Sequence, residues 1–263
     1  MQKLVELKKV VYAELVENEQ ARNGCSSDVE LIPRTMRSEA SMSYEIIKLK
    51  HNSPEWLAFR KTGIGASEAA AVLGYSNTMS NIDLWEQKMG LQKPKDLDEL
   101  ERVQYGIKAE KYLVGLFALQ YADRYRVKVN KSVVYRKDGF QFASLDGELT
   151  DKRSKELGVY EGKTVVVDSR QTWEHWRGQI PQNYYIQTLH QMLVTGRKFV
   201  VLNAEFRWNE RNEDEQVKTE GQRFLITQSA DVLADMKLLD EAEHEFWGYV
   251  KRKECPARVL PQF

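Results

Sequence analysis

Hydrophobic residues recur every three or four positions in several segments of the chain, which predicts amphipathic helices. Proline and glycine mark where some of these helices begin and end. Ser53 and Pro54 form a favourable helix start, and Gly196 is a favourable helix end. The segments expected to be helical are 2–20, "SPEWLAFR", "EAAAVLG", "NIDLWEQKMG", 101–122, "PQNYYIQTLHQMLVTG" and 230–252.

In the second half of the chain the pattern changes to short runs rich in β-branched and aromatic residues, which predict strands. These runs are "RVKVNKSVVYR", "FQFASLDGELT", "VYEGKTVVV", "KFVVLNAEFRW" and "QRFLITQS". One predicted helix lies between the third and fourth run and can serve as a crossover. This order of elements predicts an α/β fold with a central mixed β-sheet flanked by helices.

The first 45 residues differ from the rest of the chain. After the helix predicted over 2–20, "NGCSSD" and Pro33 interrupt the helical pattern, which indicates a linker. We therefore expect an N-terminal helix and linker over 1–45 and a main domain over 46–263. The N-terminus carries too many charges for the apolar region of a signal peptide.

Composition narrows the functional classes only a little. The chain has 263 residues, with 39 basic and 39 acidic side chains, so its formal net charge is zero. A nucleic-acid enzyme can still be neutral overall if its acids lie at a metal and its bases line a groove. No apolar run approaches the roughly 18 residues of a membrane span, so no membrane association is expected. Cys25 and Cys255 cannot supply an iron–sulfur cluster, and so few cysteines favour a reducing, cytoplasmic compartment.

The candidate chemistry lies in the strand "GVYEGKTVVV". Glu161 and Lys163 are two residues apart there, so they point to the same face. Asp146, followed by the turn signal Gly147, precedes Glu161 by fifteen residues. A hairpin-like connection through "TDKRSKELG" would bring Asp146 beside Glu161. The two carboxylates suit Mg²⁺, and the lysine can orient a metal-activated water for hydrolysis of a phosphodiester.

A simpler interpretation of the same residues stays open. An acid two residues before a lysine is common in strands, and such a pair is usually a surface ion pair that contributes little. An Asp-Gly pair by itself indicates only a turn.

Five sequence blocks in order resemble the YqaJ-type viral recombinase family. The blocks are "GIGASEAAAVLG", "YGIKAEKYLVGLF", "FASLDGEL", "YEGK" and "IPQNYYIQTLHQMLVTG", within residues 53–206. That family includes phage lambda exonuclease and belongs to the PD-(D/E)xK nuclease superfamily. The resemblance therefore implies a restriction-endonuclease-like α/β core.

The resemblance implies a role for each matching residue. Asp146 corresponds to the family's metal-binding Asp. Glu161 and Lys163 correspond to its ExK motif. Glu110, in "GIKAEKYL", corresponds to a helix Glu that supports the metal site, and Gln187 to a glutamine of the crossover helix near the active site.

The implied metal is Mg²⁺, which Mn²⁺ can replace. Its ligands would be Asp146, Glu161 and the backbone carbonyl of Gly162. Two positions depart from the family pattern, because Leu145 replaces a proline and Gly162 replaces an apolar residue. These departures bear on the detailed strand geometry more than on the chemistry.

Arg60 and Ser67 flank "KTGIGA" and form a second candidate site. Ser67 is expected at a helix N-terminus, which attracts phosphate, and an arginine adds charge-assisted hydrogen bonds. The resemblance implies that this pair holds the 5′-phosphate of a DNA end. The plain alternative is that Ser67 caps the helix and Arg60 is solvated.

Two further features of the sequence can each be interpreted in two ways. The segment "DSRQTWEHWRGQIP" combines basic and aromatic residues that could contact a DNA strand, or its tryptophans could pack within the protein. His190 could face the active site, or it could be a core or surface histidine without a role.

Taken together, the resemblance implies an Mg²⁺-dependent exonuclease that digests one strand of linear double-stranded DNA, 5′ to 3′, and leaves 3′ overhangs. It also implies a phage or prophage protein in the bacterial cytoplasm, a ring-shaped trimer and a single-strand annealing protein as partner. The alternatives are an endonuclease of the same superfamily, or a non-catalytic DNA-binding or partner-binding protein with the same fold.

Overall fold

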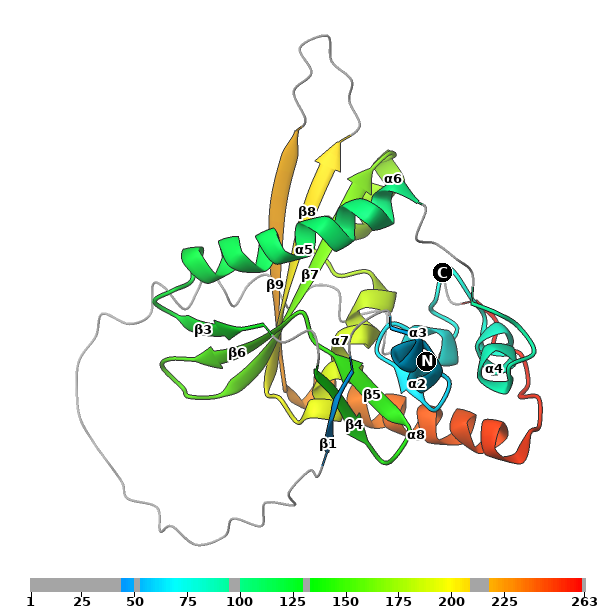
Figure 1. The fold of residues 1–263 in the computed structure, drawn as a ribbon. Helices are drawn as coiled ribbons and strands as arrows, with labels where there is room; N and C mark the ends of the chain where they lie inside the picture. Colours follow the sequence, from blue (N-terminus) through cyan, green and yellow to red (C-terminus); the bar gives the residue numbers. More distant parts are fainter. Residues whose placement is uncertain (1–43, 50–52, 95–99, 130–132, 209–217, 262–263) are drawn as a thin grey trace, which may run out of the picture. The chain divides into compact units, whose positions relative to one another are not determined.

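The computed structural model describes residues 44–49, 53–94, 100–129, 133–208 and 218–261 (Figure 1). Within those ranges no helix combines the length and apolar character of a membrane span. The helix predicted over 2–20 and the linker after it lie outside the described residues. The division into 1–45 and 46–263 therefore stays a prediction.

The larger sheet has the strand order β3-β6-β7-β8-β9. β7 and β8 are parallel, and the other neighbours are antiparallel. A parallel pair requires a crossover connection, which α6 and α7 provide. The elements are β3 (Tyr125–Lys128), β6 (Gly147–Asp151), β7 (Leu157–Val167), α6 (Arg170–Trp176), α7 (Gln182–Thr195), β8 (Phe199–Trp208) and β9 (Thr219–Thr227).

The smaller sheet has the strand order β1-β4-β5-β2 and carries three short helices beside it (Figure 1). β2 pairs in parallel with β5, and the other pairs are antiparallel. The elements are β1 (Glu45–Lys48), α2 (Pro54–Arg60), β2 (Ile64–Gly65), α3 (Ala69–Val72), α4 (Asn81–Met89), β4 (Val133–Lys137) and β5 (Gln141–Ser144).

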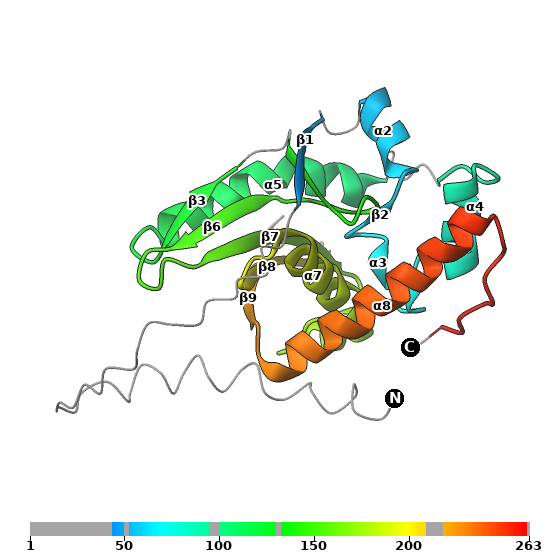
Figure 2. The same cartoon turned by 90° about the horizontal axis from the view of Figure 1, so that it is seen from below.

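Helices cover the larger sheet from both sides (Figures 1 and 2). On one side, α5 (Glu101–Gln120) packs Val114 and Phe117 against Tyr160 of β7. On the other side, α7 buries Leu189 and Met192 in the main core, and α8 (Ala230–Arg252) lies outside α7. The predicted α/β class, with a central mixed sheet flanked by helices, is confirmed.

Several helix ends follow the predicted capping chemistry. The Ser53 side chain accepts a hydrogen bond from the backbone of Trp56, and Pro54 is the first residue of α2. Gly90 and Gly196 end α4 and α7 in the left-handed conformation, which glycine adopts without steric cost.

Two of the runs that were predicted as single strands each contain two strands, so these two predictions are wrong. "RVKVNKSVVYR" contains β3 of the larger sheet and β4 of the smaller sheet. "FQFASLDGELT" likewise contains β5 of the smaller sheet and β6 of the larger sheet. One hydrophobic cluster includes residues of both sheets, so the apolar pattern continues unchanged where the chain passes between them.

A buried ion pair connects α7, α8 and the smaller sheet. His190 Nδ1 lies 2.7 Å from Glu243 Oε1, and its Nε2 lies 3.0 Å from the carbonyl oxygen of Phe142. Both partners are acceptors, so the ring donates from both nitrogens and is an imidazolium. Burial alone would lower the pKa of His190, but the charge and hydrogen bond of Glu243 raise it above its ordinary value.

This pair predicts a pH-dependent stability. Because the folded-state pKa of His190 is raised, its contribution is fully present below the unfolded pKa of about 6.5 and is lost as pH rises through the folded value. Glu243→Gln should lower the free energy of unfolding at pH 6 by about 3 kcal/mol, and it should flatten the decline toward alkaline pH. Urea unfolding across pH measures both effects, with the exposed His175→Gln as control. A wild-type stability that rises from pH 6.5 upward, relative to Glu243→Gln, would contradict the assignment.

Candidate metal centre

The pairing of β6 with β7 places Asp146 beside Glu161. Gly147 lies opposite Tyr160 across the two antiparallel strands, so Asp146, one residue earlier, lies across from Glu161. Asp146 Oδ2 also accepts a hydrogen bond of 2.9 Å from the backbone N–H of Gly162. The predicted return of the chain through a hairpin is therefore confirmed.

The predicted turn at Gly147 is wrong, because this glycine begins β6. A Cβ added there would lie 3.2 Å from the Cβ of Tyr160, which is tighter than ordinary contact. Glycine thus allows β6 to approach β7 closely directly after Asp146. The chain passes from one sheet to the other at this point rather than reversing.

Glu161 and Lys163 point to the same face of β7, as their spacing predicts. Lys163 Nζ lies 2.6 Å from Glu161 Oε1. The Glu161 side chain is buried, while that of Lys163 remains about one-fifth exposed, at 20%. Lys163 also lies over the ring of Tyr184, 5.1 Å from its centroid. The pair is therefore not the solvated surface ion pair of the simpler interpretation.

Two glutamines of α7 hold the Glu161 carboxylate. Gln187 Nε2 donates to Oε1 and Gln191 Nε2 donates to Oε2, both at 2.6 Å. The sequence pattern predicted a role for Gln187 but not for Gln191. A signal for Gln191 was present, since residues four apart on a helix share a face. Gln191 Oε1 is buried without a hydrogen-bond partner in the described structure, which costs stability and indicates that the amide is oriented for Glu161.

α5 contributes to the site from the opposite side of the sheet. The charge of Glu110 acts on both Asp146 and the hydroxyl of Tyr160. Tyr160 is fully buried beneath α5, and its hydroxyl accepts a hydrogen bond of 3.2 Å from Asn203 of β8. The structure therefore connects Asp146, Glu161, Lys163 and Gln187 through contacts of β7, and it places Glu110 near enough for its charge to act on Asp146.

Like charges crowd this centre. Burial raises the pKa of Asp146 well above its ordinary value, and the charges of Glu161 and Glu110 raise it further, while Lys163 and the Gly162 N–H oppose the rise. Burial alone would lower the pKa of Lys163, but the charges of Glu161 and Asp146 raise it above its ordinary value. Asp146 and Glu161 share the ammonium of Lys163, so these three side chains carry an excess of negative charge when both carboxyls are ionised.

These donors fit a hard divalent cation. Asp146 and Glu161 offer carboxylate oxygens, which Mg²⁺ and Mn²⁺ prefer. The N–H and C=O of one strand residue point to the same side, so the Gly162 carbonyl faces the edge where its N–H contacts Asp146. A bound cation would also compensate the excess negative charge.

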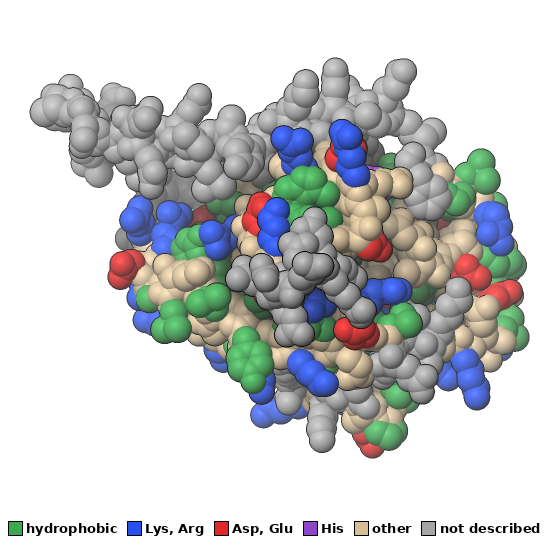
Figure 3. Space-filling model, turned by 90° about the horizontal axis from the view of Figure 1, so that it is seen from above, with side chains coloured by type: hydrophobic (Ala, Val, Ile, Leu, Met, Phe, Trp, Pro, Cys, Tyr) green, Lys and Arg blue, Asp and Glu red, His purple; other side chains and the backbone are tan. Residues whose placement is uncertain are grey.

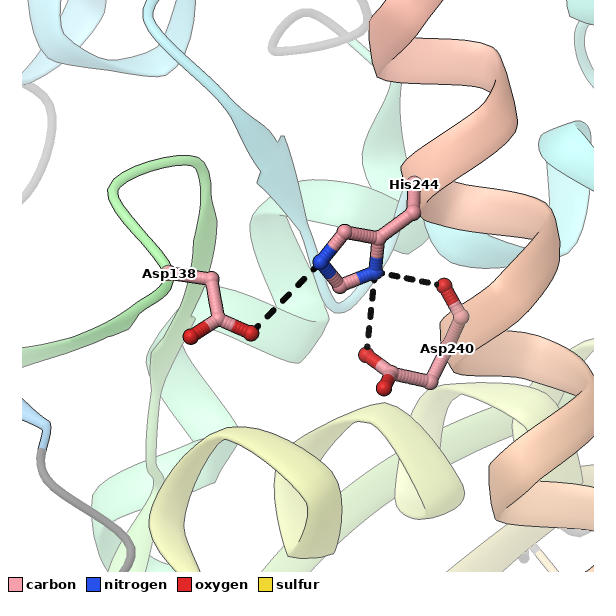
Figure 4. Close-up of side chains that lie close together, drawn as sticks. All are labelled: Asp138, Asp240 and His244. Atoms are coloured by element: carbon pink, nitrogen blue, oxygen red, sulfur yellow. Dashed lines mark hydrogen bonds and ion pairs between the residues drawn. The ribbon is translucent and has the colours of Figure 1, made fainter.

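Another group in the described part of the chain also has ligand atoms close together. Asp138, Asp240 and His244 offer atoms that all lie within 4.8 Å of one another, at the surface beside α8 (Figure 4). Lys137 Nζ already pairs with both aspartates, at 2.5 Å from Asp138 and 3.4 Å from Asp240. This lysine compensates part of their charge, and His244 also lies 3.6 Å from Asp138 and 3.4 Å from Asp240, so we interpret the group as an ion-pair network.

Arg60 and Ser67 lie in the expected segment but with different partners. Arg60 donates to Glu68 Oε1 at 2.6 Å and lies over the ring of Trp56, so it is not simply solvated. Ser67 is exposed and precedes the cap, because Glu68 is the N-cap residue of α3. Ser67 therefore does not cap α3, which spans only four residues, and its binding of a phosphate stays a prediction.

The tryptophans of the segment after β7 and the side chain of His190 both pack within the protein. Trp173 and Trp176 pack their rings against Phe206, at centroid distances of 5.3 Å and 5.5 Å. The tryptophans of "DSRQTWEHWRGQIP" thus fix α6 to the sheet. His190 faces α8 through Glu243 and does not point toward Glu161.

Residues 55–198, more than half of the chain, match the family described as YqaJ-like viral recombinase domain. The chain belongs to this family. The protein YqaJ of Bacillus subtilis (strain 168) is 28% identical over 203 residues, which are 74% of this chain and 55% of that protein. The chain thus spans little more than half the length of this relative.

Solved structures of similar shape include two exonucleases. An alkaline exonuclease from Laribacter hongkongensis is 21% identical, with a TM-score of 0.46 over 76% of this chain and 97% of that chain. A phage-related exonuclease from Haemophilus somnus 129PT is 10% identical, with a TM-score of 0.46 over 73% of this chain and 96% of that chain. These similarities are too low to assign a function to this YqaJ-family chain, so its function has to be inferred from its own site.

The charge crowding predicts how this YqaJ-family site responds to metal. Asp146→Asn keeps an acceptor for the Gly162 N–H and removes one crowded charge. In EDTA at pH 8 the variant should unfold at a higher temperature than wild type, by about 2–4 °C for each 1 kcal/mol of relieved repulsion. Mg²⁺ should raise the unfolding temperature of wild type and not that of the variant.

Differential scanning calorimetry measures both effects, with the exposed Asp123→Asn as matched control. Equal stabilisation of wild type and Asp146→Asn by Mg²⁺ would show that the cation binds elsewhere.

Proposed function

We propose that this chain is a metal-dependent deoxyribonuclease, and more specifically an exonuclease that digests one strand of linear double-stranded DNA. The observation that supports this most directly is the convergence of Asp146, Glu161 and Lys163 at one strand edge. A buried and a half-buried carboxylate beside a charged lysine suit the hydrolysis of a phosphodiester at a metal. Membership of the YqaJ family is in keeping with this chemistry.

Each residue has a distinct task in this proposal. Asp146, Glu161 and the Gly162 carbonyl would hold Mg²⁺ or Mn²⁺, which activates a water molecule and neutralises charge on the phosphate. Gln187 and Gln191 fix both oxygens of Glu161, so the carboxylate keeps one orientation. Glu110 adds negative charge from the side of α5.

The neighbouring carboxylates raise the pKa of Lys163, so its side chain is an ammonium in the free site. Its ammonium group already donates to Glu161, and an ammonium has three donors. The remaining donors would orient the attacking water or bind a phosphate oxygen, where they would stabilise developing negative charge.

Basic side chains at the surface would supply contacts for DNA. Lys and Arg side chains are spread over the face seen from above, with hydrophobic and acidic side chains between them (Figure 3). Exposed basic residues on α5 and α6 include Lys108, Lys111 and Arg170. Such side chains would bind phosphates without reading sequence, as an enzyme that degrades any duplex requires.

We further propose 5′-to-3′ digestion that produces 3′ overhangs for phage-type recombination in the bacterial cytoplasm. Arg60, with Ser67 exposed nearby, would bind the 5′-terminal phosphate. A ring-shaped trimer and a single-strand annealing protein as partner belong to the same proposal.

The most direct prediction concerns the catalytic residues. Asp146→Ala, Glu161→Ala and Lys163→Ala should each lower the turnover of linear duplex in Mg²⁺ by about 10³-fold or more, equivalent to about 4 kcal/mol. Gln191→Ala acts through Glu161 and should cost about 10- to 100-fold. The exposed Glu156→Ala on the β6–β7 connection is the control. Full activity in a folded variant of Asp146, Glu161 or Lys163 would exclude the proposed chemistry.

The type of nuclease is tested with three substrates. A linear duplex labelled at the 5′ end should release its label early as mononucleotide, whereas a 3′ label should stay long in the undigested strand. A covalently closed circle should remain intact, because it has no end. Cleavage of the circle would identify an endonuclease, and the absence of digestion or metal binding would favour a non-catalytic binding protein.

A further inference from the structure

The Arg60 side chain is held from two directions although it lies partly at the surface. Its Nη2 donates to Glu68 Oε1 at 2.6 Å, and its guanidinium lies 4.9 Å from the centroid of the Trp56 ring. The side chain is still 31% exposed. A guanidinium has five N–H donors, so donors remain for a ligand from solvent.

Glu68 is buried and connects three donors. Besides Arg60, its Oε2 accepts hydrogen bonds from Lys88 Nζ at 2.7 Å and from the backbone N–H of Gly65 at 2.9 Å. Burial alone would raise the pKa of Glu68, but the charges of Lys88 and Arg60 lower it to about 2. A Cβ on Gly65 would lie 2.9 Å from the Phe142 ring, which is too close. Only glycine therefore fits at this position beside the Glu68 carboxylate.

Lys88 reaches this carboxylate from α4. Its side chain is only 3% exposed, and its Nζ also donates to the backbone carbonyl of Arg60 at 2.8 Å. Lys88 therefore fixes both the backbone of Arg60 and the carboxylate that holds its guanidinium. Glu68 and Lys88 together form what we call the Arg60 bracket.

Arg60 and its bracket together carry unbalanced charge. Two cations, Arg60 and Lys88, share the single carboxylate of Glu68. Burying a lysine is costly, and one cation would be enough to neutralise one carboxylate. The excess positive charge favours an anion at the exposed side of Arg60.

The bracket also lies near the candidate metal centre in the fold. Gly65 pairs with Phe142 of β5, and Asp146 follows Phe142 by four residues in the chain. At about 3.3 Å for each residue, this separation is at most about 13 Å along the backbone.

We propose that Glu68 and Lys88 are positioning residues that hold Arg60 ready for the 5′-terminal phosphate and so set the preference for phosphorylated DNA ends. This inference rests on the proposed exonuclease function. Glu68 prevents the guanidinium from rotating away, while Lys88 prevents Glu68 from neutralising Arg60 completely. The anion recognised is the phosphate monoester of a DNA terminus.

The test compares initial rates on one linear duplex that carries either a 5′-phosphate or a 5′-hydroxyl. Wild type should prefer the phosphate. Arg60→Ala should bring the ratio of the two rates close to one. Glu68→Gln combined with Lys88→Met removes both charges of the bracket together, which spares the fold an unpaired buried ion. This double variant should lower the ratio about tenfold, because a charge-assisted contact is lost.

Exposed neighbours supply the controls, Glu55→Gln for the acid and Lys61→Met for the base, and both should keep the wild-type ratio. Glu68→Gln alone gives a second variant, and circular dichroism confirms that each variant is folded. A purely structural bracket would lower both rates in equal proportion, which would overturn the inference. An unchanged ratio in the folded variants, or a wild-type ratio of one, would also overturn it. Absence of digestion by wild type would instead refute the proposed function.

Discussion

Crowding of like charges where the chain passes from the smaller sheet to the larger one is the constraint on which the site depends. Asp146 stands at this passage, and its carboxylate is held by the backbone N–H of Gly162. Glu161 shares the ammonium of Lys163 with Asp146, and the charge of Glu110 adds to the repulsion on Asp146. Such an arrangement weakens the fold unless a cation relieves it, so its presence indicates a function.

The two sites of this chain have opposite imbalances of charge. The centre around Asp146 has excess negative charge, whereas Arg60 and its bracket together have two cations for one carboxylate. A divalent cation suits the first, and a terminal phosphate suits the second. A DNA end together with a metal ion would compensate both, and the pairing of β2 with β5 keeps the two sites in one part of the fold.

Much of the fold and part of the site could be predicted from the sequence. Strand β7 and the shared face of Glu161 and Lys163 follow from a period of two, and the ends of α2, α4 and α7 follow from capping chemistry. The passage between the sheets near Leu145 could not be predicted, because residues on both sides pack into one core. The partners of Arg60 were also missed, since Lys88 approaches from a separate helix.

The central claim is that Asp146 and Glu161 bind a divalent cation together. The most direct measurement is anomalous diffraction from crystals of the wild-type protein soaked in Mn²⁺. We expect a strong anomalous peak in contact with a carboxylate oxygen of each residue and with the carbonyl of Gly162. A peak confined to Asp138, Asp240 and His244, with none between Asp146 and Glu161, would contradict the account.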